Sequence, residues 1–154
     1  MLIQLFDHYA WADARVAAAL TAAHDSAERR RAIELYGHAA AAAETWLARI
    51  QARTPTRALW APIELQAAIA LSRDSLDGLR AVARESDVLV GRQVSYTNSS
   101  GASFRNTLSD CLLQAALHGV HHRAQINLLL RAAGETPPAI DYIAFVRERD
   151  ATAR

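Results

Sequence analysis

Three histidines, His38, His118 and His122, are the residues of this chain whose types and spacing best suit chemistry. His118 and His122 are four residues apart, which on a helix places their β-carbons about 5 to 6 Å from each other. Both lie within the apolar stripe of the surrounding segment, and His38 lies next to another stripe, so all three rings are predicted to face the core. One divalent cation would satisfy three imidazoles that are otherwise costly to bury. The sequence therefore predicts a metal site, with the nearest ring nitrogens about 3 to 4 Å apart.

The chemistry of such a site follows from its ligands. Three neutral imidazoles leave a divalent ion its full charge and an open coordination position, as in catalytic rather than closed structural sites. A bound water or thiol would have a lowered pKa, so hydrolysis and thiol transfer are both open to the site. Imidazole suits zinc, nickel, copper and iron alike and does not identify the metal. No glutamate lies between His118 and His122 to act as a general base, which disfavours peptide hydrolysis.

Several other residues are candidates for a second layer around the ligands or for the pocket wall. Glu34 lies one helical turn before the first of the three histidines and could accept a ring N–H, although a solvated carboxylate is an equal alternative. Arg123 and Gln125 could orient a substrate. For Arg123, pairing with Asp7 or Asp13 is favoured, because it would hold the first helix to the fourth. The pocket wall is expected to include Tyr9 and Tyr142.

The remaining histidines, the cysteine and the tryptophans are predicted to have structural roles. Three histidines are expected at the surface: His8, His24 and His121. Cys111 lies roughly 10 Å along the helix axis from His118, too far for shared coordination, and is expected to fill the core. The tryptophans are expected in the core or at an interface: Trp11, Trp46 and Trp60.

Apolar residues at helical spacing predict four long helices, which must position these side chains. Asp25 is a predicted N-cap, and Pro62 suits the first turn of the third helix. Thr107 and Asp110 have the spacing of a capping box at the start of the fourth. Residues 88–105 favour extended chain and turns, which predicts an irregular excursion or a short hairpin. The predicted helices span residues 2–23, 25–53, 62–87, 107–133 and, as a short C-terminal helix, 139–149.

The composition favours an all-α protein built as a four-helix bundle. Of the 154 residues, 51% are hydrophobic, and many of these are alanines, which favour close-packed helices over a sheet. This length fits a single domain, which is expected to span residues 1–154.

Charge, cysteine content and hydropathy restrict the partners and the location. The 17 basic and 16 acidic side chains are scattered and give a net charge of +1, so nucleic acid is not an expected partner. The lone cysteine fits a reducing compartment. No apolar run could span a bilayer, and Asp7 and His8 interrupt the apolar stretch that a signal peptide needs. We therefore expect a cytoplasmic protein without a membrane partner, forming a twofold homodimer because the bundle is alanine-rich and nearly neutral.

The histidine segment resembles a known signature. Residues 118–126 read His-Gly-Val-His-His-Arg-Ala-Gln-Ile, and they resemble the motif of the DinB-like metal-dependent family, in which two histidines four apart precede Arg, a small residue and Gln. Residues 9–13 are similar to the family's N-terminal aromatic segment, and His38 followed by Trp46 matches its second-helix histidine and tryptophan. The likeness extends over nearly the whole chain through Tyr96, Asn98, Gly101, Phe104, Leu130, Arg131, Gly134, Pro137, Pro138, Asp141, Tyr142 and Phe145.

This resemblance implies a four-helix bundle, often dimeric, in which the three histidines bind zinc, nickel or a similar ion with a water in the open position. Relatives include transferases and isomerases that use low-molecular-weight thiols, so the resemblance favours transfer of such a thiol to a small electrophilic substrate. Three positions depart from the family pattern: Asp13 for asparagine, Gln114 for histidine and Ala124 for glycine. They remove no predicted ligand, but they weaken the transfer of any particular substrate.

Other classes of function stay open at this point. The chain could be a metal-dependent hydrolase. It could be a non-catalytic module in which the metal stabilises the bundle, or in which the cleft senses a ligand, a partner or a stress signal. In a third alternative it is a metal-free structural bundle, and each histidine is a core residue satisfied by a carbonyl or a carboxylate.

Overall fold

The computed structural model describes residues 2–85 and 91–152, and it is mostly helical. The helices and strands within these residues are, in chain order, α1 (Leu2–Ala22), α2 (Ala27–Ile50), α3 (Leu65–Glu85), β1 (Gln93–Thr97), β2 (Ser103–Thr107), α4 (Leu108–Ala132) and α5 (Tyr142–Thr152). The predominance of helix agrees with the all-α expectation. Among the described residues, no helix combines the length and the apolarity that crossing a membrane requires.

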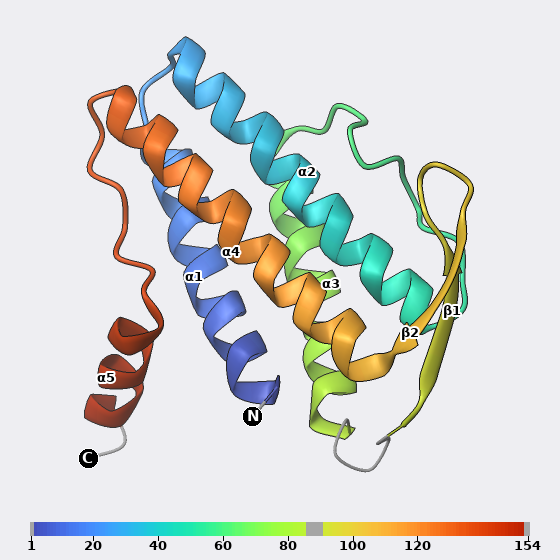
Figure 1. The fold of residues 1–154 in the computed structure, drawn as a ribbon. Helices are drawn as coiled ribbons and strands as arrows, with labels where there is room; N and C mark the ends of the chain where they lie inside the picture. The colour runs from blue at the N-terminus through green and yellow to red at the C-terminus, as the bar shows by residue number, and fades with distance from the viewer. Residues whose placement is uncertain (1, 86–90, 153–154) are drawn as a thin grey trace.

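The four long helices pack against one another, and two helices that are consecutive in the chain, α2 and α3, run in the same direction (Figure 1). α2 packs on both α3 and α4, and α1 packs on the same two helices, diagonally opposite α2. α1 and α4 run in one direction, and α2 and α3 run in the other (Figure 1). Because α2 and α3 are parallel, the segment that joins them, residues 51–64, runs back along α2 (Figure 1). This return brings loop residues beside the middle of α2.

Two apolar clusters fill the interior, and buried polar residues lie between them along the helices. On α1, Phe6 belongs to one cluster and Val16 to the other, with the buried Asp13 between them. On α4, Leu112 and Ile126 flank the histidine motif in the same way. The polar groups of the motif therefore sit between two blocks of apolar packing, where buried polar groups need partners.

α2 packs through small side chains next to His38. The five alanines from Ala39 to Ala43 are all buried. Their small volume lets neighbouring helices approach closely, which is the tight helix contact that an alanine run favours. His38 therefore lies on a stretch of α2 that is held close to α3 and α4.

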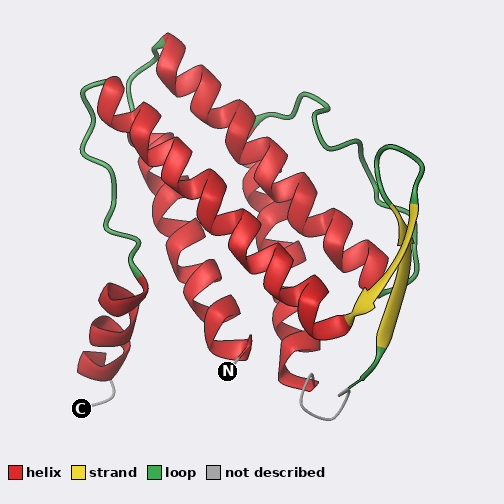
Figure 2. Cartoon of the chain, viewed as in Figure 1, coloured by secondary structure: helices red, strands yellow, loops and turns green. Residues whose placement is uncertain are grey.

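An antiparallel pair of strands, β1 and β2, lies in the connection between α3 and α4 (Figure 2). Tyr96 is opposite Phe104 in the register, and the two rings stack. In the turn, Asn98 Oδ1 accepts hydrogen bonds from the backbone N–H groups of Ser100 and Ala102. The excursion expected over residues 88–105 covers β1 and most of β2, which continues to Thr107, and its first residues, 88–90, lie outside the described residues.

The start of α2 differs by one residue from the prediction. The N-cap is Ser26, whose Oγ accepts a hydrogen bond from the Arg29 backbone N–H at 3.0 Å. Asp25, the predicted cap, instead binds the guanidinium of Arg30. Both residue types cap helices well, so the sequence alone did not separate them. The predicted cap of α4 is confirmed, because Thr107 Oγ1 accepts from the backbone N–H of residue 110.

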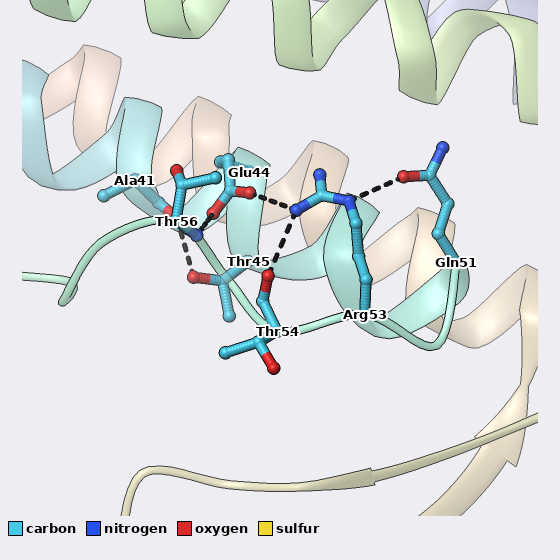
Figure 3. Close-up of polar contacts among 7 residues, drawn as sticks. All are labelled: Ala41, Glu44, Thr45, Gln51, Arg53, Thr54 and Thr56. Atoms are coloured by element: carbon cyan, nitrogen blue, oxygen red, sulfur yellow. Dashed lines mark hydrogen bonds and ion pairs between the residues drawn. The ribbon is translucent and has the colours of Figure 1, made fainter.

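α2 also ends earlier than predicted, at Ile50 rather than at Arg53. Ala52 has a φ of 55°, in the left-handed region, and the Arg53 N–H reaches back to the Ala48 carbonyl. This is the geometry of a helix end that glycine usually makes, and the sequence carries no glycine there to signal it. The Arg53 side chain then folds back onto Glu44 (Figure 3).

α3 begins at Leu65, three residues later than the predicted start at Pro62. Arg57 Nη2 donates to the carbonyl oxygens of Ala61 and Pro62, at 2.9 Å in both cases. These contacts hold the two residues in the loop and outside the helix. The predicted end of this helix, at residue 87, lies outside the described residues.

α5 packs on α1 and begins at Tyr142, rather than at residue 139. The Asp141 carbonyl accepts from the backbone N–H of Ala144, which starts the helical bonding. The Ile140 carbonyl contacts His8 Nε2 at 2.7 Å. The segment before α5 is therefore held against α1 by a side chain, which keeps it out of the helix.

Candidate metal centre

His38 from α2 and the two motif histidines from α4 come together where these helices pack. One ligand atom from each of the three rings lies within 4.8 Å of the others. The Nε2 atoms of His118 and His122 are 3.2 Å apart. Two nitrogens bound to one tetrahedral zinc at about 2.0 to 2.1 Å would be separated by about 3.3 Å, so the pair on α4 already has the spacing of metal ligands. The three rings thus converge, and the pair on α4 has the predicted spacing of about 3 to 4 Å.

In two of the rings, those of His38 and His122, the Nδ1 atom makes a hydrogen bond to an oxygen atom. His38 Nδ1 lies 3.2 Å from the Leu59 carbonyl oxygen, and His122 Nδ1 lies 2.8 Å from Gln125 Oε1. In each contact the ring nitrogen donates, because a carbonyl oxygen can only accept. Each ring therefore carries its proton on Nδ1 and leaves Nε2 with a free lone pair, as metal-binding imidazoles require.

The expected role of Glu34 is not seen. Its carboxylate binds Arg31 at 2.6 Å and is 61% exposed, which is the solvated alternative. Sequence reasoning missed Leu59, since a backbone carbonyl has no signature in the sequence. Gln125 was considered for orienting a substrate, whereas it contacts a ligand ring instead.

Burial and mutual repulsion keep the three rings neutral. Burial, followed by the charges that His122 and His38 would carry, lowers the pKa of His118 to about 4. The pKa values of His38 and His122 are also lowered, mainly by burial. The imidazoles are therefore neutral near pH 7, and the neutral form is the one that binds a metal.

Trp60 covers one face of the site from the segment joining α2 and α3. Its ring stacks on His38 with centroids 3.7 Å apart and planes 10° from parallel. Trp60 is nevertheless 58% exposed, so it does not lie in the core, and the alternative that it lies at an interface stays a prediction. The stack depends on the path of residues 51–64 back along α2, and helical periodicity does not report that path.

The histidines are open to the outside through a cavity. This cavity has a volume of about 220 Å³, and its lining includes His38, His118, Arg49 and Gln114. A larger groove of about 1060 Å³ lies between the segment after α2 and the β1–β2 turn. Both share Arg49 and Asn98 in their linings, so the groove and the cavity lie next to each other. A small molecule in the groove can thus reach two of the three histidines.

Arg123 lies directly after His122 and is 2% exposed, with its guanidinium 4.0 Å from the centre of the Tyr9 ring. The predicted pairing with an acid is not found among the described ion pairs. Asp7 binds Arg80, and Asp13 accepts hydrogen bonds from two hydroxyls, those of Tyr36 and Ser72. Arg123 still connects α4 to α1, through an aromatic ring in place of a carboxylate.

This buried layer is distinct from the wall of the cavity beside the histidines. Tyr9 is 2% exposed within the core, and burial raises its pKa to about 12. Burial also raises the pKa of the Asp13 carboxyl and lowers that of the Arg123 guanidinium. Neither Tyr9 nor Asp13 is among the described residues that line this cavity. Their contribution here is packing beneath the histidine motif.

The prediction for His8 is wrong. Its side chain is buried, with a ring contact to Tyr142 at 5.4 Å between centroids. Tyr142 thus packs on α1, and it is not among the residues lining the cavity. Outside the three converging histidines, the sequence prediction holds for two other histidines and the cysteine: His24 and His121 are exposed and Cys111 is buried.

Comparison with known proteins adds one result to this geometry. Residues 2–152 match the family model described as DinB family. The chain belongs to the DinB family. No curated protein and no solved structure matched the chain.

Proposed function

We propose that His38, His118 and His122 hold one divalent metal ion, zinc or nickel, and that this DinB-family protein is a metal-dependent enzyme. The observation that carries the proposal is the convergence of three ring nitrogens within 4.8 Å. The donor set fits such an ion, because neutral imidazole is a ligand for both metals. The Nδ1 contacts of His38 and His122 support the fit, since they leave Nε2 of each ring free.

When bound by three neutral ligands, a divalent ion supplies Lewis acidity and lowers the pKa of a water or thiol in its open position. The chain's own residues supply position and shielding. Leu59 and Gln125 fix two ring orientations, and Trp60 covers the face of His38. The cavity of about 220 Å³ is the size of a site for a small molecule rather than for a protein chain.

The reaction we propose is transfer of a low-molecular-weight thiol to a small electrophile, as an S-transferase or an isomerase. Among the described residues that line the cavity, none carries a carboxylate. Hydrolysis by an activated water generally relies on a nearby general base, often a glutamate. A thiol needs no such base once its pKa is lowered, so this lining favours thiol transfer over hydrolysis.

We further propose that α1 to α4 form the four-helix bundle of this family and that two copies associate. Along α4, the side chains of Leu113, Leu117 and Val120 are 40%, 56% and 47% exposed. Their spacing of four and three residues places them on one face of the helix. An exposed apolar stripe of this kind is typical of a helix that packs on a partner.

The metal site is tested first, on protein purified without a nickel column. Elemental analysis is expected to find about one metal ion per chain in the wild type and much less in His118→Ala, because two imidazoles bind more weakly than three. His121→Ala is the matched control, since His121 neighbours the motif in the sequence but is exposed. Equal metal content in the wild type and His118→Ala would contradict the proposal.

The reaction is tested by screening thiols against small electrophiles with the same three proteins. We expect turnover with at least one thiol for the wild type and His121→Ala, and none for His118→Ala. Metal binding without turnover, combined with unchanged thermal stability on adding thiols, would favour a non-catalytic module over an enzyme.

A further inference from the structure

The charged side chains that line the groove beside the histidines are all positive. Three arginines, Arg49, Arg53 and Arg57, are among the described residues that line it, and none of these lining residues is an aspartate or a glutamate. The whole chain has nearly equal numbers of basic and acidic side chains. The excess in the groove is therefore local, and a groove with one sign of charge attracts ligands of the opposite sign.

Two of these arginines already have partners within the protein. Arg53 Nη1 binds the buried carboxylate of Glu44 at 2.5 Å, and its Nε donates to Gln51 at 2.9 Å (Figure 3). The Glu44 carboxylate also accepts from the backbone N–H of Thr56, so its charge is fully engaged. Arg57 uses its Nη2 on two backbone carbonyls of the loop. Both arginines hold residues 51–64 in shape.

Arg49 is different, because two aromatic rings fix its position, whereas Arg57, which also makes no described ion pair, spends its Nη2 on two backbone carbonyls. Its guanidinium lies 4.7 Å from the centres of both the Trp46 and the Tyr96 rings. No ion pair found among the described residues includes Arg49, and its hydrogen bond to the Thr97 carbonyl is long, at 3.4 Å. Two aromatic rings therefore hold a charged planar group whose N–H edge is largely unused.

The position of Arg49 connects the groove to the histidines. It lines both the large groove and the smaller cavity that includes His38 and His118. Asn98 lines both spaces as well, and its Oδ1 is occupied by the turn, which leaves the amide N–H₂ as a donor. The donors of this junction thus match a ligand that carries acceptor oxygens.

We infer that Arg49 binds the carboxylate of a small organic acid whose other end reaches His38 and His118. A guanidinium edge presents two parallel N–H groups that match the two oxygens of a carboxylate. Of the three arginines that line the groove, Arg49 has the one guanidinium edge that is largely unused, and a single planar edge of this kind fits one carboxylate. The reach toward the histidines rests on the proposed function, whereas the carboxylate site at Arg49 does not.

The test is isothermal titration of the full-length protein with glutarate and with its neutral counterpart glutaramide. Since a hydrogen bond to a charged group is worth more than one between neutral groups, we expect glutarate to bind at least about tenfold more tightly. Arg49→Gln should remove this preference. Arg49→Lys, which keeps the charge but not the planar fork, should retain part of it and guards against a folding defect in the first variant.

Arg30→Gln is the matched control, because Arg30 lies in the first turn of the same helix, pairs with Asp25 and is 60% exposed. It should behave as the wild type. Glutarate preference that persists in Arg49→Gln would overturn the inference, and so would a lower melting temperature of that variant with unchanged binding, which would give Arg49 a purely structural role. Inorganic phosphate that displaces glutarate with higher affinity would overturn the choice of a carboxylate.

Repeating the titration with chelator and with added zinc separates this inference from the proposed function. Glutarate binding that depends on Arg49 but not on metal supports the carboxylate site, even if His118→Ala shows that no metal is held. Glutarate binding that requires metal and ignores Arg49 would support the metal centre and overturn the carboxylate site.

Discussion

The low pKa of His118 makes the site respond to pH in a defined direction. Its pKa is about 4 in the folded protein, compared with the ordinary value of 6.5. Between these values the unfolded chain binds more protons than the folded one, so the free energy of unfolding decreases as the pH falls. The contribution of His118 is complete above pH 6.5 and is lost as the pH falls toward 4. His38 and His122 act in the same direction.

We therefore expect the melting temperature of chelated wild-type protein to fall between about pH 7 and pH 5, and to fall less in His118→Ala. The melting temperatures of the two proteins are measured by far-ultraviolet circular dichroism, because the helical signal is lost when the protein unfolds. Asp13, whose pKa is raised by burial, acts in the opposite direction, but it is present in both proteins. Identical pH dependence in the two would show that His118 is not held neutral by the fold.

The metal ion that we propose would add a second pH effect at the same residues. An ion that binds only the folded state stabilises it by mass action, and protons compete with it for the ring nitrogens. Chelator should thus lower the melting temperature of the wild type at about pH 8, and the effect should shrink at about pH 5. In His118→Ala the chelator should have no effect at either pH. A chelator response in that variant equal to the wild type's would show that His118 is not a ligand.

Gly119, between the motif histidines, is required by the ring packed beneath it. A β-carbon at this position would lie 2.1 Å from Tyr9 Cζ and 2.4 Å from its hydroxyl oxygen. Tyr9 is buried and carries Arg123 on its face, so it has little room to move. Gly119→Ala should lower the free energy of unfolding by about 1 to 3 kcal/mol, as expected for overpacking.

Denaturant unfolding measures this change in the free energy of unfolding. The direction of the change separates overpacking from helix propensity. At an unconstrained helix position, replacing glycine with alanine stabilises the protein by up to about 1 kcal/mol through helix propensity. A Gly119→Ala protein as stable as the wild type, or more stable, would mean that Tyr9 can move aside without cost.

The convergence of His38, His118 and His122 could be predicted from the sequence because each lies in or beside an apolar helical stripe, where an unpaired imidazole is costly. The partners that hold and cover them could not. Leu59 and Trp60 reach His38 only because residues 51–64 return along α2, and this path depends on the parallel packing of α2 and α3. His8 was placed wrongly for a related reason, because α5 covers it from a distant part of the chain.

At the scale of elements, helix positions could be predicted better than helix ends. The ranges of α1 and α4 agree with the apolar periodicity to within about one residue, since long periodic segments are the most reliable signal. The end of α2 could not be predicted, because Ala52 takes a left-handed conformation that alanine rarely adopts. Its start was ambiguous between two adjacent residues that both cap well.

Substitutions at that start test the observed cap. Ser26→Ala removes the acceptor of the Arg29 N–H and should lower the free energy of unfolding by about 1 kcal/mol. Asp25→Ala removes only an exposed ion pair with Arg30, which should cost less. Chemical denaturation of both variants measures the difference. A larger loss in Asp25→Ala would show that Asp25 is the cap in solution, as the sequence analysis predicted.

At the scale of the whole molecule, two faces of α4 have different roles: one carries histidines of the candidate metal site, and the other exposes apolar side chains. Its inner face carries His118 and His122 toward α2, and its outer face exposes Leu113, Leu117 and Val120. Residues seven apart on a helix return to the same face, so this apolar stripe is continuous over two turns. A second copy covering it would leave the open side of the histidine cavity, between residues 51–61 and the hairpin turn, available to small molecules.

The dimer that we propose is therefore expected to depend on this stripe. Light scattering coupled to size-exclusion chromatography should give twice the 16.8 kDa chain mass for the wild type. Leu117→Glu should give the monomer mass, because a charge buried in an apolar interface has no partner. Ile143→Glu is the matched control, since Ile143 is 53% exposed on α5 and lies off the stripe, and it should remain dimeric. Metal content should stay at the wild-type level in both variants, because neither substitution replaces one of the three histidines. A wild-type monomer at micromolar concentration would contradict association, whereas dissociation by the Ile143 substitution alone would move the interface from α4 to α5.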